Sequence, residues 1–126
     1  MSWATDFYTP EFAELFLDAS PPTEQDIGFI KSIGALQSGA RIFDQCCGNG
    51  RLSASLDAAG FSVIGVDIIE SYIQTAKEKH PTADFFTEDA CYFTTTKPCD
   101  IALNWWTSFG YGDTPEDDKN LSLIHI

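Results

Sequence analysis

The chain has 126 residues and a mass of 13.9 kDa, which is enough for one domain. Hydrophobic residues make up 44% of it and aromatic residues 13%, so it can bury a core and is not a disordered chain. The 19 Asp and Glu residues against 7 Lys and Arg residues give a formal net charge of −12. This charge excludes proteins that grip nucleic-acid phosphates or anionic lipid, because such proteins need clustered cations.

The sequence has no run that approaches the ~18 consecutive apolar residues of a membrane span, and its first residues do not form a secretion signal. The four cysteines are Cys46, Cys47, Cys91 and Cys99. They lack the two-residue spacing of zinc sites, and no paired histidines accompany them. We therefore expect a cytoplasmic protein with reduced thiols, no metal, and neither a nucleic-acid nor a membrane partner.

Residues 10–36 predict helices, within an N-terminal segment of residues 1–36. Between residues 11 and 18, aromatic and leucine side chains recur at the helical spacing. Thr23, with Asp26 three residues later, is typical of a helix start, and isoleucines at steps of three follow it. We expect these helices to form a lid segment ahead of the sheet.

From residue 40 onward, short apolar runs alternate with amphipathic stretches that have the helical period. The predicted strands cover residues 41–44, 61–67, 83–87 and 100–105. Strands separated by helices are typical of a parallel sheet with helical crossovers. The sequence therefore predicts an α/β fold, a Rossmann-like parallel sheet with helices on both faces.

The segment from Asp44 to Gly50, Asp-Gln-Cys-Cys-Gly-Asn-Gly, lies where the first predicted strand passes into a helix. Gly48 and Gly50 let the backbone turn tightly and let a ligand approach without meeting a Cβ atom. The N–H groups that open the following helix favour negatively charged ligand atoms. The segment therefore predicts a ligand-binding loop.

Two acidic positions follow later strands. Asp67 ends the second predicted strand, where a carboxylate can accept hydrogen bonds from both hydroxyls of an adenosine ribose; the alternative role is a helix cap. Asp89 follows the third strand, where a carboxylate can accept from the adenine amine while the next N–H, of Ala90, reaches a ring nitrogen; the alternative is a turn cap. Together they predict an adenosine-type cofactor.

Two such cofactors fit these residues, a nicotinamide dinucleotide and S-adenosylmethionine (SAM). The dinucleotide fingerprint requires Gly or Ala where this chain has Ser53. Asp44 would also repel a pyrophosphate, whereas it suits a ligand that carries an ammonium group. SAM is therefore preferred, and an NAD-dependent oxidoreductase is the alternative.

Residues 44–53 resemble the first motif of class I SAM-dependent methyltransferases, residues 63–68 their second, and residues 87–90 their third. Residues 100–104 are similar to the fourth strand of that family, whose end faces the methyl acceptor. The resemblance covers residues 38–120 and is closest to the subgroup with a Cys-Cys-Gly-x-Gly-Arg loop.

The resemblance implies a role for each matching position. Asp44 would meet the amino group of the methionine part, Asp67 the ribose hydroxyls and Asp89 the adenine amine, while Asn104 would border the methyl-donor end. The family often has Gly where this chain has Cys46. The implied cofactor-binding residues are Asp44, Cys46, Gly48, Asn49, Gly50, Asp67, Ile68, Asp89, Ala90 and Asn104.

The complete sheet of this family has seven strands, and the sequence supplies about four of them. We therefore expect residues 37–120 to be a partial SAM-binding methyltransferase domain, truncated at its C-terminal end. The last six residues, 121–126, match a translated sequencing adapter, and we expect them to be a scar.

The acceptor is less well defined by the sequence. The Asn-Pro-Pro-Tyr motif of enzymes that methylate adenine or glutamine is absent, since two tryptophans follow Asn104. Trp105 and Tyr111 lie in an aromatic, glycine-rich stretch and are candidates for an apolar acceptor pocket, with core packing as the alternative. We expect methyl transfer to a small molecule, with no catalytic base assigned. A non-catalytic domain that binds an adenosine cofactor is the further alternative.

Overall fold

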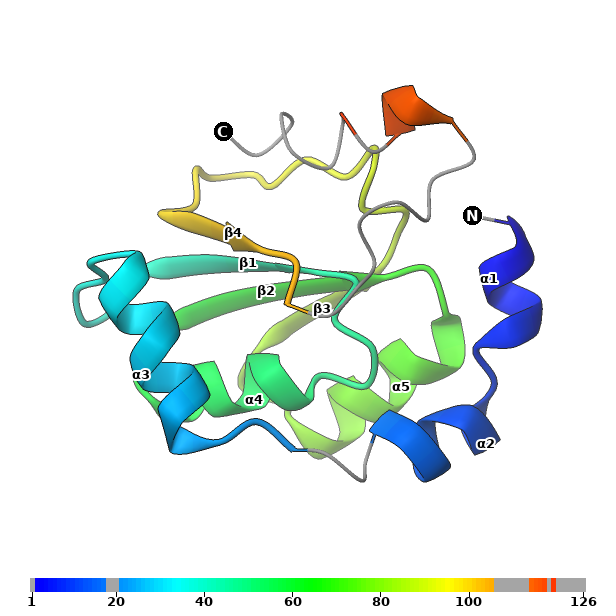
Figure 1. Cartoon of the computed structure of the whole chain (residues 1–126), viewed down its shortest axis with the longest axis horizontal. Coiled ribbons are helices and arrows are strands. Elements are labelled where there is room, and N and C mark those ends of the chain that lie inside the picture. The colour runs from blue at the N-terminus through cyan, green and yellow to red at the C-terminus, as the bar shows by residue number, and fades with distance from the viewer. Residues whose placement is uncertain (1, 18–20, 106–113, 118, 120–126) are drawn as a thin grey trace.

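The computed structural model describes residues 2–17, 21–105, 114–117 and 119 (Figure 1). Its elements in chain order are α1 (Ser2–Phe7), α2 (Pro10–Phe12), the π-helical turn η1 (Ala13–Leu17), α3 (Glu24–Ile33), β1 (Arg41–Gln45), α4 (Arg51–Ala58), β2 (Ser62–Asp67), α5 (Glu70–Lys79), β3 (Asp84–Thr87) and β4 (Ile101–Leu103).

The four strands of the described residues form one parallel sheet in the order β3-β2-β1-β4. Asp44 in β1 lies opposite Gly65 in β2 on one side and opposite Leu103 in β4 on the other. Asp67 at the end of β2 lies opposite Thr87 at the end of β3. The carboxyl ends of the strands therefore meet at one edge of the sheet, and the predicted α/β fold with a parallel sheet and preceding helices is confirmed.

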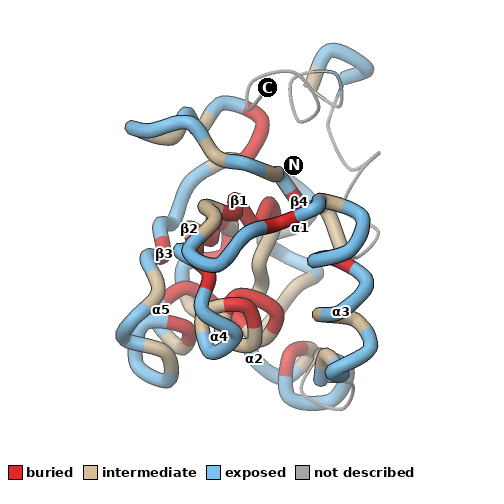
Figure 2. The backbone as a smooth tube through the Cα atoms, turned by 90° about the vertical axis from the view of Figure 1, so that its left-hand side faces the viewer, coloured by how far each residue is buried: buried red, intermediate tan, exposed pale blue. Residues whose placement is uncertain are grey.

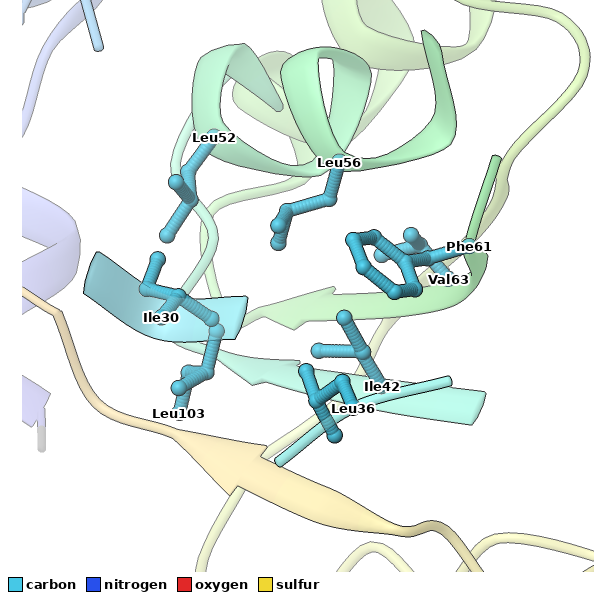
Figure 3. Packing of buried hydrophobic residues seen from close by; sticks show 8 residues of the cluster. All are labelled: Ile30, Leu36, Ile42, Leu52, Leu56, Phe61, Val63 and Leu103. Carbon is cyan, nitrogen blue, oxygen red and sulfur yellow. The ribbon is translucent and has the colours of Figure 1, made fainter. Parts of the chain in front are cut away.

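Helices α3, α4 and α5 lie against the same face of the sheet (Figure 1). Alternate strand residues point to this face, and they meet the apolar sides of α3 and α4 in one cluster. Figure 3 shows its members, Ile30, Leu36, Ile42, Leu52, Leu56, Phe61, Val63 and Leu103. Next to this cluster, α5 packs through Ile73 and Ala76 on Phe85 of β3.

Helices are expected on both faces of the sheet, but among the described residues the opposite face is covered by the segment that follows β3, which forms no helix. Phe43 and Val66 on this face pack against Ala90 and Cys91, and the ring of Phe93 stacks on Phe43 with centroids 5.7 Å apart. Figure 2 shows the buried residues gathered at the strands and on the sides of α4 and α5 that face them. Both faces of β1 are therefore shielded from water, as expected for a central parallel strand.

The observed start of α3 agrees with the start predicted from the sequence, whereas the helices before α3 differ from the prediction. Thr23 and Asp26 form the expected capping box, with each side chain bonded to the other residue's backbone N–H. The predicted helix over residues 11–18 is instead α2 continued by η1, and its last residue lies outside the described residues. Helix α1 was not predicted. The expected scar at 121–126 also lies outside the described residues.

The first prediction concerns Gly65, whose neighbours leave no room for a side chain. A Cβ atom there would lie 2.9 Å from Phe85 Cδ1 and 3.0 Å from Cys47 Sγ. We expect Gly65→Ala to lower the free energy of unfolding by about 1–3 kcal/mol, because the aromatic ring and the loop must shift. Urea unfolding followed by circular dichroism measures this.

Gly28→Ala is the matched control. Gly28 is exposed within α3, and a Cβ atom there would meet nothing within 4 Å. This variant should raise the free energy of unfolding by about 0.5–1 kcal/mol, because alanine favours the helix. If Gly65→Ala were as stable as the unaltered protein, the close packing of β2 on Phe85 would be wrong.

Candidate functional site

The loop from Cys46 to Gly50 joins β1 to α4 and has an unusual backbone. Cys46, Gly48 and Gly50 have φ angles of 55°, 60° and 84°, in the left-handed region that favours glycine. Gly50 also has no room for a side chain, since a Cβ atom would lie 2.8 Å from Phe85 Cζ. The Cys47 N–H donates to the Val66 carbonyl at 2.9 Å, which ties the loop to β2.

Asp44 is a buried acid at the end of β1, with 2% of its surface exposed. The hydroxyl of Ser53, which is fully buried in the first turn of α4, donates to Asp44 Oδ2 at 2.6 Å. Burial raises the pKa of Asp44 to about 7, the bonds from Ser53 act in the opposite direction, and the charge of Asp67 adds to the rise. Ser53, whose position in the sequence is a mismatch to the dinucleotide fingerprint, is thus the partner of Asp44.

Asp67 connects three parts of this edge. Its Oδ2 accepts a hydrogen bond from the Gly48 N–H, and its Oδ1 accepts one from the Ile69 N–H, both at 2.9 Å. Its backbone carbonyl accepts from the Glu88 N–H at 3.0 Å, just ahead of Asp89. Burial raises the pKa of Asp67, and the two backbone N–H bonds partly offset that rise.

Asp89 forms the turn that follows β3. Its Oδ1 accepts from the Cys91 N–H at 2.9 Å, and its carbonyl accepts from the N–H groups of Tyr92 and Phe93. Ala90 is buried against Phe43 and Val66, on the face of the sheet opposite to α3, α4 and α5. The turn-cap role considered for Asp89 is therefore present, and the residue before it, Glu88, is bonded through its N–H to the end of β2.

Asn104 and Trp105 follow β4. Asn104 Nδ2 is the one buried side-chain nitrogen or oxygen of the described residues that has no hydrogen-bond partner. Trp105 packs against the cluster of α3, α4 and the strands, with its ring 6.2 Å from that of Phe29. Core contacts thus account for the burial of Trp105. Tyr111, the other acceptor candidate, lies outside the described residues.

The N-terminal segment lies against the same edge. Ala13 packs with Ile69 and Tyr72, and Tyr8, Leu17 and Ile68 line this cluster. Leu17 Cδ1 is 3.5 Å from the position that a Cβ atom of Gly48 would take. The Tyr72 hydroxyl donates to the Thr9 carbonyl at 2.7 Å. No local pattern predicts this hydrogen bond, because it joins residues 63 positions apart.

The structure therefore brings most of the predicted cofactor residues to one edge. Asp44, the glycine loop, Asp67 and Asp89 follow three neighbouring parallel strands, and Asn104 follows the fourth. The described residues contain no group of three or more His, Cys, Asp or Glu side chains that could hold a metal ion. No helix among them is long and apolar enough to cross a membrane.

Solved structures with this fold come from several methyltransferases. A TehB-like SAM-dependent methyltransferase from Corynebacterium glutamicum is 20% identical with a TM-score of 0.72, and the match covers 96% of this chain and 64% of that one. A SAM-dependent methyltransferase from Thiobacillus denitrificans, in complex with S-adenosyl-L-homocysteine, is 19% identical with a TM-score of 0.64, covering 85% of this chain and 46% of that one. Magnesium protoporphyrin IX methyltransferase (ChlM) from Synechocystis PCC 6803, with bound SAM, is 21% identical with a TM-score of 0.66, covering 98% and 70%.

At these identities the similarity shows a shared fold. The chain spans 64% and 46% of the length of the first two of these proteins. No curated protein matches the sequence. A family model described as "Methyltransferase domain" matches residues 42–125, which is well over half of the chain and begins in β1. The chain therefore belongs to the methyltransferase-domain family.

Proposed function

We propose that this chain binds SAM at the carboxyl edge of its sheet and takes part in methyl transfer to a small-molecule acceptor. The observation that carries the proposal is the bond from the Gly48 N–H to Asp67, which joins the glycine loop to the ribose-binding position. Bound SAM supplies a methyl group on a positively charged sulfur, so the protein has to bind and align both reactants.

The adenosine part fits the ends of β2 and β3. The two oxygens of a carboxylate offer about four lone-pair positions, and the N–H groups of Gly48 and Ile69 use two at Asp67. The others suit the ribose hydroxyls. Asp89 and the Ala90 N–H would receive the adenine, and Ile68 would lie against it. The remaining loop contacts would come from Cys46, Gly48, Asn49 and Gly50.

The methionine part fits the end of β1. Asp44 is buried and acidic, and a cationic ammonium is the partner that compensates a buried carboxylate best. The pyrophosphate of a nicotinamide dinucleotide would instead bring negative charge to this carboxylate. This contrast supports SAM over the dinucleotide alternative.

The lid role proposed for the N-terminal segment is supported by Leu17, which lies beside Gly48. A small-molecule acceptor is supported by the net charge of −12, since a nucleic-acid substrate would be repelled. One protein with this fold is named for magnesium protoporphyrin IX, which is a small molecule. Trp105 and Tyr111 stay candidates for the acceptor side.

Isothermal titration of the protein with S-adenosylhomocysteine (SAH) and with NAD tests the proposal directly. We expect SAH to bind and NAD not to bind. The reverse result would replace the methyltransferase proposal by the oxidoreductase one. SAH binding without methylation of any acceptor, in a screen with radiolabelled SAM, would support the non-catalytic alternative.

The second prediction concerns Asp67. Asp67→Asn keeps one oxygen acceptor for a backbone N–H but loses the charge and the second acceptor. Hydrogen bonds to a charged group contribute about 1.5–3 kcal/mol, so SAH affinity should fall by about 10–100-fold. Titration of the folded variant measures this.

Asp84→Asn is the matched control for Asp67→Asn. Asp84 is exposed and opens β3, at the opposite edge of the sheet from the carboxyl ends. It should bind SAH like the unaltered protein. Equal affinity for SAH in both variants would remove Asp67 from the ribose site.

The third prediction concerns pH. An ammonium beside Asp44 favours the charged carboxylate, so SAH binding should lower its pKa from about 7 and release a proton. We therefore expect SAH affinity to rise with pH up to about 7, by up to about tenfold per pH unit. Titrations in buffers of different ionisation enthalpy count the released proton.

The stability of the ligand-free protein should change with pH in the opposite direction. Because the folded pKa of Asp44 lies above the ordinary value of 3.8, its contribution to stability is complete below that value and is lost as pH rises through about 7. Asp44→Asn should abolish the pH dependence of SAH affinity near pH 7 and reduce that of stability, to which Asp67 also contributes, and Asp84→Asn should keep both. A pH-independent SAH affinity in the unaltered protein would contradict the ammonium site.

A further inference from the structure

The amide nitrogen of Asn104 is a buried donor with nothing to donate to. It is the only such side-chain atom among the described residues. A buried polar group without a partner destabilises the protein that carries it, and in native structures such groups mark places where something else binds. We therefore asked which group could accept its hydrogen bond.

Asn104 lies beside the acid at the end of β1. Leu103 pairs with Asp44 in the parallel register, so Asn104 is one residue beyond the direct neighbour of Asp44. Neighbouring strands are about 4.8 Å apart, so the two residues lie at adjacent strand ends on the carboxyl edge. A buried carboxyl that suits a cation and a buried amide that suits an acceptor oxygen therefore belong to the ends of neighbouring strands, β1 and β4.

An α-amino acid head group carries both complementary groups, an ammonium and a carboxylate, on one carbon atom. Under the proposed function, on which this inference rests, Asp44 binds the ammonium of the methionine part. The carboxylate is attached to the same carbon, so a donor at the end of the neighbouring strand β4 would be a partner for it. The strand order β3-β2-β1-β4 agrees, because adenine and ribose lie over β3 and β2 and the amino acid end extends towards β4.

We propose that Asn104 Nδ2 donates a hydrogen bond to the carboxylate of the methionine part and so makes the site specific for a zwitterionic amino acid head. A neutral amide suits this position better than a cation, because a Lys or Arg there would pair with Asp44 and neutralise the ammonium site. The segment from Asp100 to Trp105 contains neither Lys nor Arg.

The test compares two ligands on three proteins. The ligands are SAH and its analogue that lacks the carboxylate but keeps the amine. The proteins are the unaltered chain, Asn104→Leu, which replaces the amide by an apolar group of similar size, and Asn104→Asp, which replaces the donor by an anion. Isothermal titration gives the ratio of the two affinities for each protein, and thermal unfolding checks the fold.

The unaltered protein should prefer SAH over the analogue by about 10–100-fold, as expected for a hydrogen bond to a charged group. Asn104→Leu should reduce this preference to about threefold or less, mainly by weakening SAH. Asn104→Asp should reverse it, because the new charge repels the carboxylate and attracts the amine. Asn104→Leu should also unfold at a higher temperature without ligand, since the unpartnered donor is gone.

The other outcomes separate a failure of this inference from a failure of the proposed function. If either folded variant keeps the full preference for SAH, the amide does not bind the carboxylate, and the inference is overturned while the proposed function stands. The same conclusion follows if the unaltered protein binds both ligands equally. If the unaltered protein binds neither ligand, the SAM-binding proposal itself fails, and the assignment of Asn104 fails with it.

Discussion

The hydrogen bond from the Gly48 N–H to Asp67 Oδ2 holds the β1–α4 loop against the end of β2, and the arrangement of the carboxyl edge depends on it. The other oxygen of the same carboxylate binds the Ile69 N–H, at the residue that opens α5. A single side chain thus orients a loop on one side and a helix on the other. The backbone donors around Asp67 partly offset the cost of burying its charge, which raises its pKa.

Burying acids is costly in a chain whose net charge is already −12. Asp44 and Asp67 end adjacent strands, and the charge of Asp67 helps to raise the pKa of Asp44. Ser53 lowers that cost by donating its hydroxyl to Asp44. A bound cation would lower it further. The acidity that argues against gripping nucleic-acid phosphates would also act at the proposed site, where it would favour a ligand with a positive charge near β1.

Much of this arrangement could be predicted from local patterns. The alternation of apolar runs with stretches of helical period predicts the parallel sheet. The pair Thr23 and Asp26 predicts the start of α3. A parallel sheet places the carboxyl ends of all its strands at one edge, so the residues after each strand can be grouped from the sequence alone. Gly50 was predicted as a turn residue, and the structure adds a second reason in its contact with Phe85.

Other features could not be predicted because they depend on distances through space. Nothing in the sequence indicates that the Ser53 hydroxyl donates to Asp44. This hydrogen bond depends on how the first turn of α4 is placed relative to β1. The contact of Tyr72 with Thr9 joins distant segments. The lack of a partner for Asn104 Nδ2 is a property of its buried surroundings. Periodicity alone also does not distinguish a regular helix from the π-helical turn η1.

The N-terminal segment shows how the contacts of Asp67 extend beyond the loop. Tyr72 belongs to α5, the helix that begins next to the Ile69 N–H bound by Asp67, and its hydroxyl binds Thr9. Leu17 continues the same packing as far as Gly48, whose N–H Asp67 also binds. The loop and α5 are therefore both bonded to Asp67, and the N-terminal segment packs against both of them. Because all three border the proposed cofactor position, a ligand hydroxyl bound to Asp67 would be held by the same group that sets the spacing of the surfaces around it.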